Sequence, residues 1–131
     1  MNKLFYPAVF HEAEEGGFWV TFPDFPECFT EGDDMTQAYE MAFDALGLCL
    51  SSRETEKEPI PSPSKPKNIA VSDGEFLVVI EFDMLSYRKR NSTAYVRKNV
   101  TIPEWLNEAA LSMNVNFSQV LQDALIKIVA K

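Results

Sequence analysis

The chain has 131 residues and a net charge of −8, with two cysteines and one histidine. That length fits one ordinary domain or two small ones, and 46% hydrophobic with 24% charged residues is typical of a globular chain. The few cysteines and the single histidine exclude a disulfide scaffold and a Cys/His zinc cluster within one chain. No apolar run is long enough to span a bilayer and no signal-peptide pattern opens the chain, so we expect a cytoplasmic protein with no membrane partner. We also expect no cofactor.

Charge is divided unevenly along the chain. Residues 1–85 hold 17 Asp and Glu against 5 Lys and Arg, a net charge of −12, whereas residues 86–131 hold 3 against 7, a net charge of +4. Such asymmetry indicates that the two parts meet different partners. The acidic part disfavours nucleic acid, because Lys and Arg supply most non-specific affinity for phosphates, and it favours a basic protein.

The first fifty residues predict strands followed by a helix. The expected elements are strands at 4–11, 18–22 and 28–30 and a helix at 35–50. A Gly-containing turn joins the first two strands, and Pro23 to Pro26 end the second. Asp34 is expected to cap the helix with Gln37 as its capping-box partner, and apolar residues then recur at helical spacing.

The next segment is rich in proline and polar residues. Residues 53–67 predict an extended surface connection. After it, residues 76–82 are apolar enough for a central strand buried on both faces. Residues 69–71 could form a fifth strand. Residues 1–83 then form an acidic domain of order β-β-β-α-β, and the polar residues 84–93 form a hinge.

The last forty residues show the sharpest pattern. Apolar and polar residues alternate from Tyr95 to Thr101, and Pro103 is placed to start a helix. Asn114 suits a left-handed C-cap, and Asn116 suits the N-cap of a second helix. The second helix carries an apolar stripe too wide for so short a segment to bury alone, so we expect an intertwined homodimer.

Strand, helix, turn and helix in this order resemble the ribbon-helix-helix DNA-binding domains, over residues 94–131. The positions that match the family's base-reading residues are Arg97, Asn99 and Thr101. Phosphate contacts are expected at Lys98 and at the start of the second helix, at Asn116, Phe117 and Ser118. The expected dimer core is Val100, Ile102, Trp105, Leu106, Val120, Leu121, Leu125 and Ile128. The same alternation also occurs on the solvated face of an ordinary edge strand.

Residues 4–66 resemble a second family, the HicB antitoxins. The resemblance rests on Gly17 to Asp33, with Phe22-Pro23-Asp24 and Gly32-Asp33 in order, on the helix that follows and on Ile60-Pro61. The chain departs from the family at Glu27, where glycine is usual, and at Asp34, where threonine is usual. The resemblance implies an α+β protein: a partial ribonuclease-H-like N-terminal domain followed, in this chain, by the ribbon-helix-helix domain.

The HicB resemblance also implies a function. It implies an antitoxin that neutralises a small basic HicA-type toxin, which is an RNase that cleaves mRNA. The antitoxin would also repress its own operon by binding operator DNA as a dimer. A larger assembly with the toxin remains an open alternative. The expected toxin-binding residues are Glu12, Glu14, Glu15, Asp24 and Asp33. The alternative interpretation of these side chains is a solvated acidic surface that serves solubility.

Two other functions remain open from the residues. One is a free-standing ribbon-helix-helix repressor whose acidic domain binds a different ligand or protein. The other is a metal-dependent nuclease, for which the available carboxylates are Asp24, Asp33, Asp34 and Asp44. We expect no catalytic residue and no metal site, because no carboxylate lies centrally within the first two strands. Cys28 and Cys49 fit structural roles.

Overall fold

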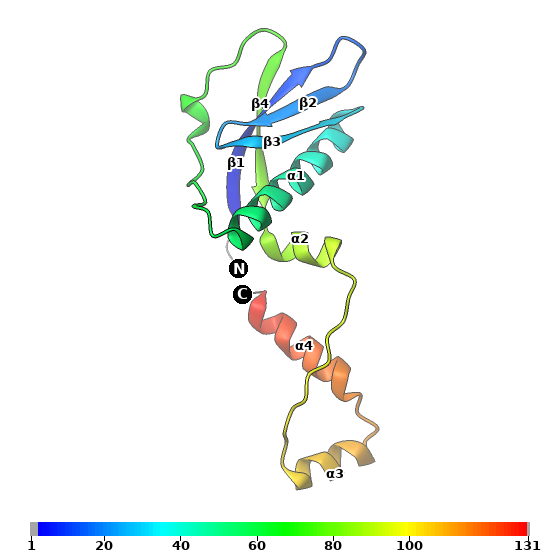
Figure 1. Cartoon of the computed structure of the whole chain (residues 1–131). Coiled ribbons are helices and arrows are strands. Elements are labelled where there is room, and N and C mark those ends of the chain that lie inside the picture. Colours follow the sequence, from blue (N-terminus) through cyan, green and yellow to red (C-terminus); the bar gives the residue numbers. More distant parts are fainter. Residues whose placement is uncertain (1–2, 131) are drawn as a thin grey trace. The chain divides into compact units, whose positions relative to one another are not determined.

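The computed structural model describes residues 3–130, which form an α+β protein (Figure 1). Its strands are β1 (Leu4–Glu12), β2 (Phe18–Phe22), β3 (Phe25–Gly32) and β4 (Glu75–Phe82). Its α-helices are α1 (Met35–Thr55), α2 (Met84–Asn91), α3 (Glu104–Ser112) and α4 (Phe117–Val129). The chain divides into two compact units after Asn91. Within residues 3–130, no helix is both long and apolar enough to cross a membrane.

The N-terminal unit is an antiparallel sheet with strand order β3-β2-β1-β4. The predicted order of three strands, a helix and a further strand is confirmed. The prediction of a central strand at residues 76–82 is wrong, because β4 lies at the sheet edge and pairs only with β1. Burial follows this position: Ile80 and Phe82 are buried, whereas Val79 is 38% exposed. Sequence apolarity could not distinguish an edge strand from a central one, since pairing joins residues far apart in the chain.

Helix α1 covers one face of the sheet (Figure 1). The core between them contains aromatic and aliphatic side chains from all four strands together with Ala38, Ala42, Leu46 and Leu50 of the helix. The predicted cap is confirmed, since the Gln37 amide donates to the Asp34 carboxylate at 2.8 Å. The Gln37 side chain accepts from the amide of Asp33 at 2.6 Å, one residue earlier than in the usual capping box.

Helix α1 ends at Thr55, five residues beyond the predicted end at residue 50. The apolar spacing stops near residue 50, but Arg53 in the added turn binds Glu27 of β3 at 2.8 Å and the carbonyl of Pro59 at 2.9 Å. Tertiary contacts of one polar side chain therefore hold a helical turn that apolar periodicity does not reveal.

The connection from α1 to β4 contains one short 3-10 helix at Pro66–Asn68 and otherwise forms neither helix nor strand. Three hydrogen bonds fasten it to the sheet: the Tyr6 hydroxyl donates to the Pro61 carbonyl at 2.7 Å, and the amide and hydroxyl of Ser64 donate to the two carboxylate oxygens of Asp24 at 3.0 and 2.5 Å. Residues 69–71 form no strand, so the fifth strand that the sequence left open does not form.

Residues 84–91 form helix α2, where the sequence predicted a hinge. Asp83 stabilises its first turn, because its carboxylate accepts from the Leu85 amide and the Ser86 hydroxyl, both at 3.0 Å. The Tyr87 ring then packs beside Phe43 of α1 and Phe82 of β4 and lies against Gly47, where a Cβ atom would overlap the ring. Tyr87 and Met84 are the α2 side chains that pack against the core, and two positions are too few to leave an apolar periodicity in the sequence.

The C-terminal unit contains α3 and α4 joined by a short turn. Pro103 is the N-cap of α3, Asn114 has φ of 56°, and the Asn116 side chain accepts from the Gln119 amide at 3.0 Å, so the three predicted boundary residues are confirmed. Residues 92–103 form neither helix nor strand. The strand that the alternation predicts at residues 95–101 therefore does not form within the single chain, because a β-ladder needs the backbone of a neighbouring strand.

Candidate functional site

The expected base-reading segment lies open to solvent. Arg97, Asn99 and Thr101 are exposed, as is Lys98 between them. Together with α4, residues 94–99 line a groove of about 900 Å³, whose α4 wall includes Ser118, Leu121 and Leu125. The extended segment thus combines cationic and amide side chains with access from outside. These are the groups that a base edge or a phosphate binds.

The expected dimer-core residues are also open to solvent. No side chain between residues 92 and 130 is buried, even though α4 is strongly amphipathic. Exposed fractions are 69% for Trp105, 64% for Ile128, 56% for Val120 and 49% for Leu125. Val100, Ile102 and Leu106 are exposed as well, and Leu121 is half-buried. Most of the apolar surface of these residues is therefore left uncovered within the unit, and Leu121 is the one that is partly covered.

The residues expected to contact a phosphate besides Lys98 lie at the start of α4. The Asn116 side chain uses the Gln119 amide, and the amides of Phe117 and Ser118 lie in the first turn, where a helix offers no acceptor of its own. Both residues are exposed. The geometry is that of a helix N-terminus able to accept an anion.

Four of the five expected toxin-binding carboxylates gather at one end of the sheet. Glu12 ends β1, Glu14 and Glu15 lie in the β1–β2 turn, and Asp33 follows β3. The turn is held beside β3 by Gly17, which has φ of +79° and would place a Cβ atom 2.6 Å from the Gly32 carbonyl oxygen. All four carboxylates are exposed, and we call this group the acidic end of the sheet.

Asp24 is separated from this acidic end. It lies in the β2–β3 turn at the other end of the two strands, and both of its oxygens accept hydrogen bonds from Ser64. The structure therefore gives Asp24 a clear structural role, that of fastening the proline-rich connection to the sheet. Sequence spacing could not show this, because Asp24 and Ser64 are forty residues apart.

The sheet face turned away from α1 carries exposed aromatic residues that the sequence reasoning did not single out. Exposed fractions are 72% for Phe29, 52% for Phe5 and 46% for Trp19. The Trp19 ring stacks on His11 at 3.6 Å, and the imidazole contacts Glu75 at 2.8 Å. The signal was present in the strand alternation, since Trp19 occupies a position opposite to buried Val20. His11 lies within β1, as the strand predicted at residues 4–11 requires.

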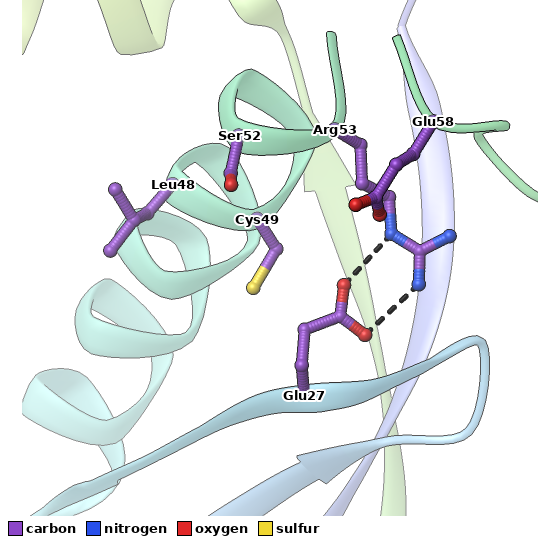
Figure 2. A pocket seen from close by; sticks show the side chains of 6 residues that line it. All are labelled: Glu27, Leu48, Cys49, Ser52, Arg53 and Glu58. Carbon is purple, nitrogen blue, oxygen red and sulfur yellow. Dashed lines mark hydrogen bonds and ion pairs between the residues drawn. The ribbon is translucent and has the colours of Figure 1, made fainter. Parts of the chain in front are cut away.

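A pocket of about 560 Å³ lies between α1 and β3 (Figure 2). Arg53 spans it with two hydrogen bonds to Glu27, at 2.8 and 2.9 Å, and its guanidinium lies 5.0 Å from the centre of the Phe25 ring. The hydrogen bond from Arg53 holds the pKa of Glu27 below its usual value. Because both oxygens of Glu27 are engaged, the pair is built to brace α1 against β3.

The two thiols and the carboxylates considered for a nuclease have surroundings that the structure describes. Burial raises the pKa of Cys28 and of Cys49, which keeps both thiols protonated and poorly nucleophilic. The carboxylates considered for a nuclease are dispersed, since Asp34 caps α1 and Asp44 pairs with Arg90 of α2 at 3.5 Å. Throughout the described part of the chain, no three His, Cys, Asp or Glu side chains converge as a metal site requires.

Comparison with known families identifies the chain. A family model described as the HicB-like antitoxin of bacterial toxin–antitoxin systems matches residues 6–124, most of the sequence. The chain belongs to this family. Among curated HicB-like relatives, Antitoxin HicB 1 of Photorhabdus laumondii is 45% identical over 65 residues, which are 48% of this chain and 42% of the relative. The matched part therefore spans less than half of that relative's length.

Solved structures of HicB-like proteins share the fold. A chain of a toxin–antitoxin complex from Streptococcus pneumoniae superposes with a TM-score of 0.60 at 26% identity, covering 96% of this chain and 99% of that one. A chain of a HicA3 and HicB3 toxin–antitoxin complex superposes with a TM-score of 0.53 at 28% identity, covering 61% of this chain and 99% of that one. The similarity thus includes proteins solved within toxin–antitoxin complexes.

Proposed function

We propose that this HicB-like chain neutralises a small, basic HicA-type RNase through residues 1–83 and represses its own operon through a dimeric domain of residues 94–131. The observation that carries the proposal is the contrast in burial. An acidic unit has its own core, and it is followed by a unit in which residues 92–130 leave their apolar side chains uncovered. The solved toxin–antitoxin complexes that resemble the chain supply the class of partner for the acidic unit. A cytoplasmic location follows from both partners.

The acidic end of the sheet is the proposed first contact with the toxin. Glu12, Glu14, Glu15 and Asp33 point a concentrated negative charge toward solvent, and a basic partner is attracted to such a surface over several ångströms. The adjoining aromatic face supplies apolar area, with Trp19 and Phe29 as its large exposed side chains. Charge would govern the association rate, and the aromatic residues would govern the lifetime of the complex.

The C-terminal unit is the proposed ribbon-helix-helix domain. Two copies of residues 95–101 would pair antiparallel and place Arg97, Asn99 and Thr101 in the major groove. Lys98 and the amides at the start of α4 would bind phosphates. Pairing would also cover the dimer-core residues that are now exposed. The partial ribonuclease-H-like character of the N-terminal unit is part of the same proposal, supported by three strands followed by a helix over one face.

A truncation tests the division of labour. A fragment of residues 1–91 keeps the whole core, α2 included, and we expect it to remain a folded monomer that inhibits RNA cleavage by the toxin encoded beside its gene. The fragment should bind no operator DNA. If a folded fragment fails to inhibit cleavage even in large molar excess, the toxin site is not in this unit.

Charge neutralisation tests the toxin surface. Glu12→Gln/Glu14→Gln/Glu15→Gln should slow association with the toxin at least tenfold at low salt, with a smaller effect at high salt. Glu40→Gln/Glu56→Gln/Glu58→Gln makes the same change of net charge at exposed positions outside the acidic end. Equal slowing by both triple variants would indicate that net charge alone matters and would reject the acidic end as the contact.

A further inference from the structure

The strongest concentration of basic residues lies between Asp83 and Glu104. Residues 84–103 hold five of the twelve Lys and Arg residues of the chain and no Asp or Glu, although the whole chain has a net charge of −8. Arg97 and Lys98 belong to the proposed ribbon. The other three, Arg88, Lys89 and Arg90, lie in α2, which is part of the acidic N-terminal unit.

The contacts of α2 leave these cations available. Arg88 pairs with Glu54 at 3.1 Å and Arg90 with Asp44 at 3.5 Å, but the two arginine side chains remain 59% and 46% exposed. Exposed pairs of this kind contribute little to stability, and a guanidinium binds a phosphate with the same bidentate geometry that it uses for a carboxylate. Tyr87 anchors α2 through the aromatic contacts with Phe43 and Phe82. The arginines are thus free to exchange partners while α2 stays docked.

Chain connectivity keeps α2 close to the ribbon in every arrangement of the two units. Asn91 ends α2, and Tyr95 begins the alternating segment four residues later. A fully extended chain spans at most about 3.6 Å per residue, so these two residues lie within roughly 14 Å of each other. Charges interact over a screening length of about 10 Å at 0.1 M salt, and duplex DNA carries a charge for about every 1.7 Å of its axis.

We propose that α2 is a second phosphate-binding surface, at which Arg88, Lys89 and Arg90 contact the DNA backbone beside the base pairs read by the ribbon. The inference rests on the proposed DNA binding of residues 94–131 and assigns to the toxin-binding unit a direct share in that binding. A dimer presents two such helices, one from each copy of the chain. Their contribution is independent of sequence, because phosphates carry no base information.

The test compares two triple variants of the full-length chain. Binding to a mixed-sequence duplex and to the DNA that precedes its gene is measured across a salt series. Arg88→Gln/Lys89→Gln/Arg90→Gln should weaken binding to both duplexes by the same factor, about tenfold or more at low salt, and lower the steepness of log K against log salt by roughly 0.9 for each phosphate that the variant no longer neutralises. The preference for the gene's own DNA should persist.

The control removes the same charge elsewhere. Lys57→Gln/Lys65→Gln/Lys67→Gln alters three exposed positions of the proline-rich connection and should leave the salt dependence unchanged. Arg88→Lys/Arg90→Lys keeps the charges of α2 and should retain most of the affinity, which separates loss of charge from loss of folding. Thermal melts check that each variant is folded.

The outcomes are separable. An unchanged salt dependence in the α2 triple variant, or equal losses in both triple variants, overturns the role of α2 while DNA binding by the ribbon stands. If the parent chain binds neither duplex at low salt, the proposed DNA binding fails and the role of α2 fails with it. Loss of preference for the gene's own DNA in the α2 variant would mean that α2 acts through the ribbon and does not contact the backbone.

Discussion

The two units of the chain make opposite use of their apolar residues. In the N-terminal unit, aromatic and aliphatic side chains from the sheet and α1 form a core in which Phe10, Phe25, Leu46 and Ile80 have no exposed surface. In the C-terminal unit, α4 carries an equally clear apolar stripe, yet Leu125 is 49% exposed and Ile128 is 64% exposed. The first unit completes its core within one chain, and we infer that the second completes its core only against another copy.

The energetic reason lies in size. Burying one aliphatic side chain is worth about 1.5 to 3 kcal/mol, and a segment of some forty residues rarely buries enough of them to offset the loss of chain entropy. The N-terminal unit escapes this limit because its strands and α1 bury side chains against one another. Its stability is therefore independent of concentration, whereas that of a dimer-dependent unit varies with concentration.

The largest expected effect breaks the contrast directly. Leu121→Glu places a charge in the apolar stripe of α4, where dimerisation would bury it, and should abolish both dimerisation and DNA binding while the N-terminal unit stays folded. Light scattering measures the oligomeric state. Gln119→Glu adds a charge on the polar side of the same helix and should leave the dimer intact. A Leu121→Glu variant that remains a dimer and binds DNA would disprove the ribbon-helix-helix assignment.

The next effect sharpens the role of the exposed ribbon. Arg97→Ala should cost about 1 to 3 kcal/mol of operator binding and relax the preference at one base position in each half-site, because the bidentate hydrogen bonds to a base are removed. Asn99→Ala should behave in the same way. Lys98→Ala, which removes a side chain proposed to bind phosphate, should weaken binding to all sequences alike. Specificity ratios at fixed salt provide the measurement, and unchanged ratios in Arg97→Ala and Asn99→Ala would exclude base reading.

A smaller effect tests whether α2 belongs to the N-terminal unit. Alanine normally stabilises a helix interior by about 1 kcal/mol relative to glycine. At Gly47 the added Cβ atom would overlap the Tyr87 ring, so Gly47→Ala should instead destabilise the unit by about 1 to 2 kcal/mol in urea denaturation. In the Tyr87→Ala background the same change should become stabilising. A stabilising effect in both backgrounds would mean that α2 does not dock on α1.

The smallest effect concerns the brace between β3 and α1. The pKa of Glu27 is lowered in the folded protein by the hydrogen bond from Arg53, so its contribution is present above the ordinary value of 4.5 and is lost as the pH falls through the lowered value. Glu27→Gln should remove this part of the pH dependence, with a smaller effect on stability than Gly47→Ala, since Glu27 is half exposed. Urea midpoints of the two proteins should converge in acid and separate toward neutral pH.

Features that depend on neighbours in the chain were predictable from the sequence. Asp34 and Asn116 cap their helices because a short polar side chain reaches an amide three residues ahead. Asn114 takes a left-handed conformation and Pro103 starts α3 for reasons that lie within one or two residues. The same local rules placed β1, β2 and α1, and with the family resemblance they predicted the HicB-like assignment.

Features that depend on residues far apart were not predictable. The sequence could not place β4 at the sheet edge, dock α2 through Tyr87 or extend α1 to Thr55, because each follows from a contact with a distant segment. Nor could it show that Asp33 joins the acidic end while Asp24 is fastened to Ser64 at the other end. Local backbone preferences and capping are encoded residue by residue, whereas strand order, docking and the grouping of charges are decided by packing, which only the tertiary structure contains.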